Sequence, residues 1–305
     1  MLNKIFLLKK IYPYCLSRVK NLKSSNMNIL VTALEQSLIM LPLILGMYIS
    51  YRILKITDLT VDGTYVLGAA VFARSLSFGL FPALIFAVIA GGIIGSIVSV
   101  MQKNNRINGL IAGILASFML YSVNLQIMQR PNISVLGMPT LLSILDLENW
   151  LIPLVIINCL IICSVIILLK GKLGLFLRAF GFNKDLLINL GKPAELYRTI
   201  GFSISNCLAA LTGTLSAQVN GFADINMGFG VALVGIGAIV IGRHILIHAN
   251  NFNAFKEILS CLIGILFYFI ALGFLLRIGI DPINLKLILG IVLFISLSSV
   301  KREAL

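Results

Sequence analysis

Two aspartates and two glycines interrupt an otherwise apolar stretch at 57–73, TDLTVDGTYVLGAAVFA. A carboxylate is costly in the hydrocarbon core of a membrane, and glycine weakens a helix while it permits close backbone approach. A plain transmembrane helix rarely carries this combination, so the stretch predicts a broken or re-entrant helix that lines a polar cavity. The candidate site residues of this stretch are Asp58, Asp62, Gly63 and Gly68.

The composition is that of an integral membrane protein. Of 305 residues, 59% are hydrophobic and 11% are charged, whereas about a quarter of the residues in a soluble domain are charged. The net charge of +13 could indicate nucleic-acid binding, but the basic residues gather in short segments between apolar runs, as orientation signals do. The five cysteines form no CxxC pair. We therefore expect a protein of the lipid bilayer with no nucleic-acid partner, no metal site and no cofactor.

Nine apolar runs divide the chain, and about 20 helical residues span a bilayer. These runs are residues 29–53, 64–79, 80–101, 109–128, 151–169, 201–220, 228–247, 257–276 and 284–299. Several are long enough to cross and some are short. The pattern predicts an all-α, polytopic membrane protein with about 8–9 membrane helices, of which one or two are broken or re-entrant.

Charge predicts the orientation, because cytoplasmic segments of membrane proteins are rich in lysine and arginine. Residues 1–26 contain six basic residues and no acidic one, which predicts a cytoplasmic N-terminal extension; Met27 is an alternative start. The other segments that we expect to be cytoplasmic are the connections 102–108 and 170–200 and the tail 301–305. The loop at 129–150 is expected to be external.

Parity adds a constraint on the first broken stretch. Three apolar runs lie between residues 26 and 102, although both ends of this interval are expected to be cytoplasmic. One run should therefore enter the membrane and return to the same side. We expect residues 57–79 to be this re-entrant element, because they contain the polar residues and glycines that such an element requires.

A second interrupted run lies at 220–242, NGFADINMGFGVALVGIGAIVIG. Its candidate site residues are Asp224, Asn226, Gly228 and Gly230. Paired short, glycine-broken segments are the best sequence indication of a pathway between two structural repeats, so we expect two pseudo-repeated halves. The alternative is that these glycines only let helices pack closely. Whether residues 228–247 cross fully or turn back is left open.

Three segments in combination resemble a known family. They are YRILKITDLTVDGTYVLGAAV at 51–71, GFNKDLLINLGKPAELYRTIGFSISNCLAALTGTLSAQ at 181–218 and GFADINMGFGVALVGIGAIVIG at 221–242. The chain is thus similar, over residues 27–300, to the permease subunits of bacterial ABC importers of the branched-chain amino acid and ribose class. Within that class it most resembles permeases paired with tryptophan- or tyrosine-type substrate-binding proteins. One departure is Arg243 with His244, where these relatives tend to carry an acidic residue.

The resemblance implies a multi-pass permease of the bacterial inner membrane, with a translocation path for an amino acid or a similar small polar solute. It also implies a homodimer that binds a cytoplasmic ABC ATPase and an extracytoplasmic substrate-binding protein. The chain has no GxxxxGK[ST] motif, so ATP hydrolysis would belong to the ATPase partner, and this subunit would not be an enzyme. An ion-coupled secondary transporter or a channel is the alternative, and it would not require a coupling loop.

The segment 170–200 is the cytoplasmic coupling loop that the resemblance implies. Its coupling residues are Asp185, Leu187, Asn189, Gly191, Glu195 and Arg198. Gly191 and Pro193 can end one short helix and begin another. A solvated loop that only sets orientation is the alternative, but it leaves unexplained the apolar side chains at 186–190, which require a surface to cover.

The aspartates have two candidate roles. An acidic residue can cap the N-terminus of a half-helix, which here would start at Thr64, or it can contact the substrate. We expect Asp58, Asp62 and Asp224 to lie in one polar cavity between the two halves. Within it, we expect Asp62 to act as the cap and at least one of Asp58 and Asp224 to be functional.

Overall fold

The computed structural model describes residues 30–103, 107–141, 151–246, 253–278, 287, 290 and 291. Within these residues, six helices are long and apolar enough to cross a membrane. They are Leu30–Ile53, α3 (Leu80–Met101), α4 (Gly109–Met128), α6 (Leu151–Lys170), α9 (Ala194–Asn220) and α11 (Ala254–Arg277). The prediction of an all-α, polytopic membrane protein is confirmed, whereas the count of eight or nine membrane helices is not.

The remaining elements are short. They are η1 (Tyr48–Ile53, a π-helical end of the first helix), α2 (Thr60–Ser75), η2 (Leu76–Phe78), β1 (Asn132–Ser134), α7 (Lys172–Phe182), α8 (Lys184–Asn189), β2 (Phe222–Asp224) and α10 (Val231–Leu246). The two strands pair antiparallel, with Asn132 opposite Asp224. The extension 1–26, the tail 301–305 and most of the apolar run 284–299 lie outside the described residues.

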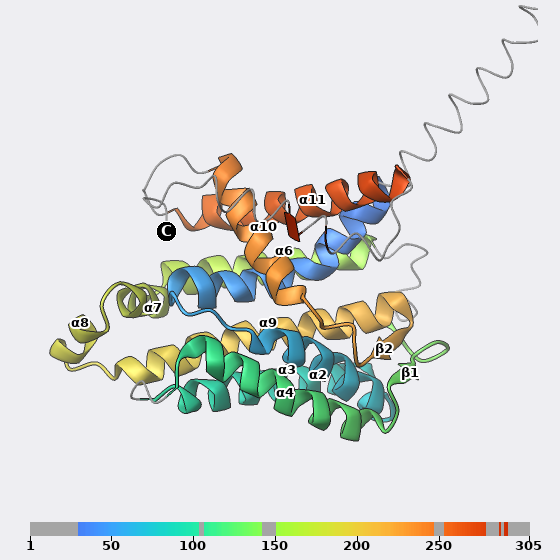
Figure 1. The fold of residues 1–305 in the computed structure, drawn as a ribbon, viewed down its shortest axis with the longest axis horizontal. Helices are drawn as coiled ribbons and strands as arrows, with labels where there is room; N and C mark the ends of the chain where they lie inside the picture. The colour runs from blue at the N-terminus through green and yellow to red at the C-terminus, as the bar shows by residue number, and fades with distance from the viewer. Residues whose placement is uncertain are drawn as a thin grey trace, which may run out of the picture.

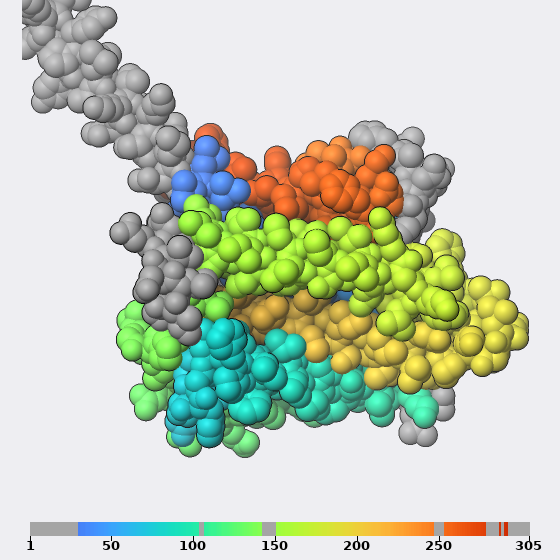
Figure 2. All heavy atoms as spheres, turned by 180° about the vertical axis from the view of Figure 1, so that it is seen from behind, coloured from blue at the N-terminus to red at the C-terminus, as the bar shows by residue number. Residues whose placement is uncertain are grey.

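The long helices lie roughly along the long axis of the molecule (Figure 1). We name its two ends the hairpin end, which holds β1 and β2, and the coupling end, which holds α7, α8, the end of α3 and the start of α4. Figure 2 shows α7 and α8, in yellow, projecting at the coupling end. The described residues of the connections 102–108 and 170–200 thus share one end, as predicted from their charge.

The first broken element passes from one end of the molecule to the other, so the predicted re-entrant path is wrong. Helix Leu30–Ile53 runs from the hairpin end to the coupling end, and residues 54–59 then return in extended form to the middle (Figure 1). From there α2 continues to the hairpin end, where Arg74 donates a hydrogen bond to Gln129 beyond the end of α4. Because three segments cross between Leu30 and Met101, the first helix begins at the end opposite to the one where α3 ends, so the premise that both ends of this interval share one side is wrong.

Two three-part units run in opposite directions. The first consists of helix Leu30–Ile53, the extended segment with α2, and α3; the second consists of α9, residues 221–230 with α10, and α11 (Figure 1). Both α2 and α10 have 16 residues and begin near the middle of the molecule. Residues 221–246 therefore also cross in two pieces. Opposed units with discontinuous helices are typical of transporters that hold their substrate near the membrane midplane.

Small residues let α2 and α3 approach the backbone of α9. A Cβ atom added at Gly68 of α2 would lie 2.1 Å from the carbonyl oxygen of Ala210, and one added at Gly91 of α3 would lie 2.5 Å from that of Asn206. No side chain fits at such distances without backbone movement. Close packing through small residues is the usual way in which membrane helices associate, because lipid supplies no hydrophobic force between them.

We expect Gly68→Ala to lower the free energy of unfolding by about 1–3 kcal/mol, because the added methyl group forces α2 away from α9. Gly92→Ala is the matched control, since a Cβ atom there would meet only the side-chain ends of Cys207 and Ser203. Denaturant unfolding in detergent micelles would measure both. Equal stability of the two variants would contradict this account of the α2–α9 contact.

Candidate functional site

Asp58 is fully buried where the extended segment meets α2. Its Oδ1 accepts a hydrogen bond from the Thr60 backbone N–H (2.9 Å), and its Oδ2 accepts one from Asn206 Nδ2 of α9 (2.8 Å). Thr64 Oγ1 donates to Asn206 Oδ1 (2.7 Å). A buried carboxyl group is tolerated only with such partners, so this network fixes the start of α2 on α9.

Asp62 lies in the first turn of α2, but its carboxyl group faces the other broken helix. It accepts hydrogen bonds from the backbone N–H groups of Gly230 (3.2 Å) and Ala232 (2.6 Å) at the start of α10. The first N–H groups of a helix have no partner within that helix, and an acidic side chain satisfies them and complements the helix dipole. Asp62 therefore caps α10, and not a helix starting at Thr64 as the sequence suggested.

A cavity of about 640 Å³ lies beside this junction. Four of the predicted site residues line it: Asp62, Gly63, Gly228 and Gly230. The other lining residues are Leu59, Val66, Ile114, Ser117, Phe118, Tyr121, Asn124, Ile225, Phe229 and Leu233. The cavity thus has a mainly apolar and aromatic wall, with the Asp62 junction as its charged feature.

The glycines at the junction have specific geometric roles. A Cβ atom at Gly228 would lie 2.3 Å from the backbone oxygen of Asp62, so only glycine lets this turn approach α2. Gly230 has a φ of +82°, a conformation that glycine adopts readily. The Gly63 backbone oxygen accepts a hydrogen bond from Asn124 Nδ2 (3.0 Å).

The other four predicted residues lie away from the cavity wall. Asp58 is buried in the network described above, and Gly68 lies in the α2–α9 contact. Asp224 lies in the strand pair at the hairpin end, where its Oδ2 accepts from Asn132 Nδ2 (3.1 Å) and its Oδ1 from the Asn226 N–H (2.8 Å). The expectation that Asp58, Asp62 and Asp224 share one cavity is therefore wrong, because the strand pair holds Asp224 outside it.

Sequence reasoning missed the face of α4 that lines the cavity. Ser117, Tyr121 and Asn124 lie at helical spacing on that face, and Ser117 Oγ donates to the backbone oxygen of Leu59 (2.7 Å). Asn124 is 1% exposed, and its Oδ1 has no hydrogen-bond partner among the described residues. The spacing i, i+4, i+7 of polar groups in an apolar helix is a signal that could have found this face.

At the coupling end, α8 presents an apolar outer surface. Asn183 Oδ1 accepts from the backbone N–H of Asp185 (2.9 Å) and so caps α8, while Leu187 is fully buried and anchors it. The surface, here named the tip, consists of the exposed side chains Phe182, Leu186, Ile188 and Leu190. Asp185, Asn189 and Gly191 are exposed beside it.

Glu195 and Arg198 lie behind the tip and connect it to α3. Glu195 pairs with Lys184 of α8 (Nζ to Oε1, 3.3 Å) and with Arg198. Arg198 is buried and donates to the backbone oxygens of Ser99 (2.7 Å) and Gln102 (3.0 Å) at the end of α3. These bonds satisfy carbonyl groups that a helix C-terminus leaves free. Of the predicted coupling residues, Leu187, Glu195 and Arg198 thus face inward.

Arg243 finds its acidic partner on another helix. Its Nε lies 3.4 Å from Oε2 of Glu257 in the first turn of α11, and the Glu257 side chain is buried. The basic residue that departs from the expected pattern therefore joins α10 to α11. In the part of the chain that the structure describes, no three His, Cys, Asp or Glu residues are grouped so that they could hold a metal ion.

Comparisons with known proteins agree with this architecture. A family model described as the permease component of branched-chain amino acid transport systems matches residues 29–297. An uncharacterized protein of Rickettsia prowazekii (strain Madrid E) is 85% identical over 280 residues, which are 92% of this chain and all of that protein. A tyrosine transport system permease protein of Clostridioides difficile (strain R20291) is 33% identical over 275 residues, 88% of this chain and 90% of that protein.

Among solved structures, PsaBC of Streptococcus pneumoniae in complex with Fab covers 80% of this chain and 90% of its own, at 15% identity and a TM-score of 0.39. That likeness is too low to carry an argument. The family match spans all six candidate membrane helices and confirms the predicted resemblance. The chain belongs to the family of permease components of branched-chain amino acid transport systems.

Proposed function

We propose that this inner-membrane protein forms the substrate path of an ATP-driven importer for an amino acid. The cavity beside the Asp62 junction is the observation that carries this proposal, because it lies where two discontinuous helices meet. Half-helix ends that meet at a central cavity form the substrate sites of many secondary transporters, and we propose the same use here. In this account Asp62, Gly63, Gly228 and Gly230 line the path, Asp58 and Gly68 support it, and Asp224 and Asn226 shape its hairpin-end rim.

The wall of the cavity suits an amino acid with an apolar or aromatic side chain. Phe118, Tyr121 and Phe229 offer ring surfaces, and Asn124 offers an unpaired acceptor for an ammonium group or a hydroxyl group. A relative that bears the name of a tyrosine transport permease supports this choice of substrate class.

The proposed assembly is a homodimer. Phe118, Phe229 and Leu233 line the cavity but are 73%, 60% and 62% exposed, so one chain leaves this wall uncovered. A second copy facing it would enclose a path and remove these side chains from lipid. We further propose that a substrate-binding protein docks at the hairpin end, because the loop at 129–150, which is expected to be external, begins there.

Energy would come from a separate ABC ATPase that docks on the tip. The tip presents large apolar side chains at an end that is predicted to be cytoplasmic, where lipid cannot cover them. Movement of α8 would reach α3 through Lys184, Glu195 and Arg198. Because α3 and α9 are in close contact, this displacement would act on the Asp58 network and the start of α2.

The proposed path predicts that Leu233→Trp abolishes uptake, because a larger side chain fills the cavity at the start of α10. Uptake of labelled tyrosine by proteoliposomes that contain the permease, its ATPase and its binding protein would measure this. Ile97→Trp is the matched control, since Ile97 is an exposed apolar residue of α3 that does not line the cavity.

In the same assay, uptake by the unchanged protein should require ATP and should persist when ionophores collapse ion gradients. Uptake driven by an ion gradient without ATP would contradict the proposal and favour the ion-coupled alternative. Full uptake by Leu233→Trp would show that the cavity is not part of the substrate path.

The proposed docking surface predicts that Ile188→Asp weakens association with the ATPase by about tenfold or more, because a charge replaces an apolar contact at the centre of the tip. Co-purification of the ATPase with the permease would measure this. Leu136→Asp, an exposed leucine at the hairpin end, is the control and should retain the ATPase. Normal co-purification with Ile188→Asp would contradict docking on the tip and would favour the alternative that the loop only sets the orientation.

A further inference from the structure

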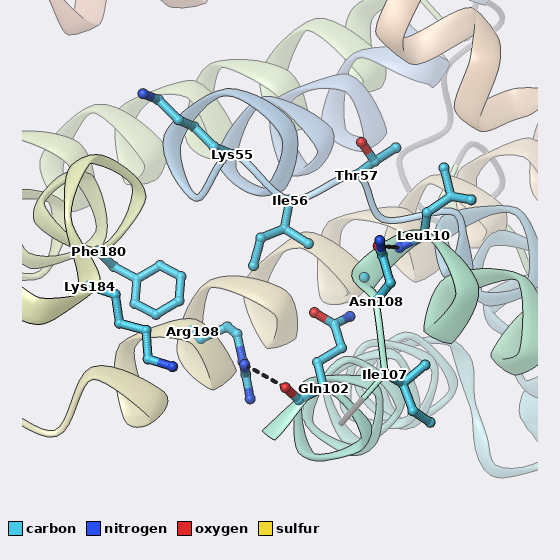
Figure 3. Close-up of a pocket in the computed structure, with 11 residues that line it drawn as sticks. Lys55, Ile56, Thr57, Gln102, Ile107, Asn108, Leu110, Phe180, Lys184 and Arg198 are labelled. Carbon is cyan, nitrogen blue, oxygen red and sulfur yellow. Dashed lines mark hydrogen bonds between the residues drawn. The ribbon is translucent and has the colours of Figure 1, made fainter. Parts of the chain in front are cut away.

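A second cavity, of about 520 Å³, lies at the coupling end and has no role in the proposed path. It is bounded by the extended segment before α2, by Gln102, Ile107 and Asn108 between α3 and α4, and by the α7–α8 region (Figure 3). We name it the basal cleft. Its polar and charged lining residues are Lys55, Thr57, Gln102, Asn108, Lys184 and Arg198.

The lining of the basal cleft is positively charged. Lys184 and Arg198 contribute cationic groups, whereas the ammonium group of Lys55 lies 4.6 Å from the centroid of the Phe182 ring and points away from the cleft (Figure 3). No described residue of the lining is acidic. Glu195 pairs with both Lys184 and Arg198, so its single negative charge neutralises only one of these two positive charges. The cleft therefore retains a net positive charge that a bound anion would neutralise.

The start of α4 adds a second favourable feature for an anion. Asn108 and Gly109 line the cleft at the N-terminus of this 20-residue helix. Asn108 Oδ1 accepts from the backbone N–H of Leu110 (3.1 Å), which leaves other first-turn N–H groups for a ligand. The positive end of the helix dipole favours negative charge at this position.

The side chain of Gln102 is an independent indication that the basal cleft binds a ligand. The residue is 4% exposed, and its side-chain Nε2 has no hydrogen-bond partner among the described residues. Figure 3 shows its amide group in the cleft between Ile56 and Asn108. A buried amide donor without a partner is unfavourable, whereas a charged acceptor in the cleft would satisfy it after a small rotation of the side chain.

We propose that the basal cleft binds a phosphate-type oxyanion, either from the head group of an anionic phospholipid or from free phosphate. The bound group would contact Gln102, the start of α4 and Lys184, and would thus connect the ends of α3 and α4 at the coupling end to α8. Binding at this position would stabilise one arrangement of the coupling end. The proposal concerns ligand binding to the permease by itself and does not depend on transport.

The test uses the purified permease in nanodiscs of phosphatidylcholine. The thermal unfolding midpoint is measured as phosphate is added against chloride of matched ionic strength, and again after phosphatidylglycerol replaces part of the lipid. We expect at least one of the two to raise the midpoint. A rise with phosphate identifies a soluble ligand, and a rise with phosphatidylglycerol alone identifies a lipid head group. No rise in either arm would overturn the proposal.

Two variants locate the effect. Gln102→Leu removes the amide donor and Lys184→Gln removes a charge, and each should require a roughly tenfold higher ligand concentration for the same shift. Lys170→Gln, at an exposed position of the same end outside the cleft, should keep the full shift. The readout is the ligand-induced shift, so a change in basal stability does not obscure it. A shift that survives both cleft variants, or that Lys170→Gln loses equally, would also overturn the proposal.

Discussion

The hydrogen bonds from the start of α10 to Asp62 are the interaction on which the arrangement of the two units depends. A membrane protein can leave few backbone groups unpaired, and a helix that begins in the middle of the bilayer exposes several N–H groups there. Asp62 satisfies two of them from a residue of the opposite unit, at Gly230 and Ala232. These hydrogen bonds offset the cost of placing a carboxyl group within the membrane. They also connect the two broken helices, α2 and α10.

The backbone groups of the extended segment before α2 are also paired inside the protein, but by several different partners. The Ile56 N–H donates to the backbone oxygen of Ser50, the Thr60 N–H to Asp58, and the Leu59 oxygen accepts from Ser117 Oγ. Each of these groups thus finds a partner inside the protein. The extended segment lies between the cavity and the basal cleft, since Leu59 lines the first and Lys55 to Thr57 line the second. A displacement of the coupling end would therefore change both spaces, with Arg198 linking α9 to α3.

Much of the fold could be predicted from the sequence, because hydrophobic runs set the limits of membrane helices. The runs 80–101 and 109–128 correspond to α3 and α4 within a residue, and the two broken elements were recognised from their aspartates and glycines. The path of the first broken element was predicted wrongly, because the parity argument placed both ends of the interval 26–102 on one side, whereas the first helix begins at the hairpin end and α3 ends at the coupling end. The partner of Asp62 could not be predicted, because the N–H groups that it binds lie 168 and 170 residues further along the chain. For the same reason the roles of Asn206 and of the α4 face emerged only from the three-dimensional packing.

Hydrogen–deuterium exchange of the backbone N–H groups at 228–235 tests the capping of α10 by Asp62 most directly. Asp62→Ala should accelerate exchange at Gly230 and Ala232 by about tenfold, since it removes the acceptor, whereas Asp62→Asn should retain part of the protection because its amide oxygen still accepts. Asp185→Ala, which removes an exposed carboxylate at the coupling end, should leave this exchange unchanged. Unchanged exchange at 228–235 in Asp62→Ala would contradict the account, because the start of α10 would then be held without Asp62.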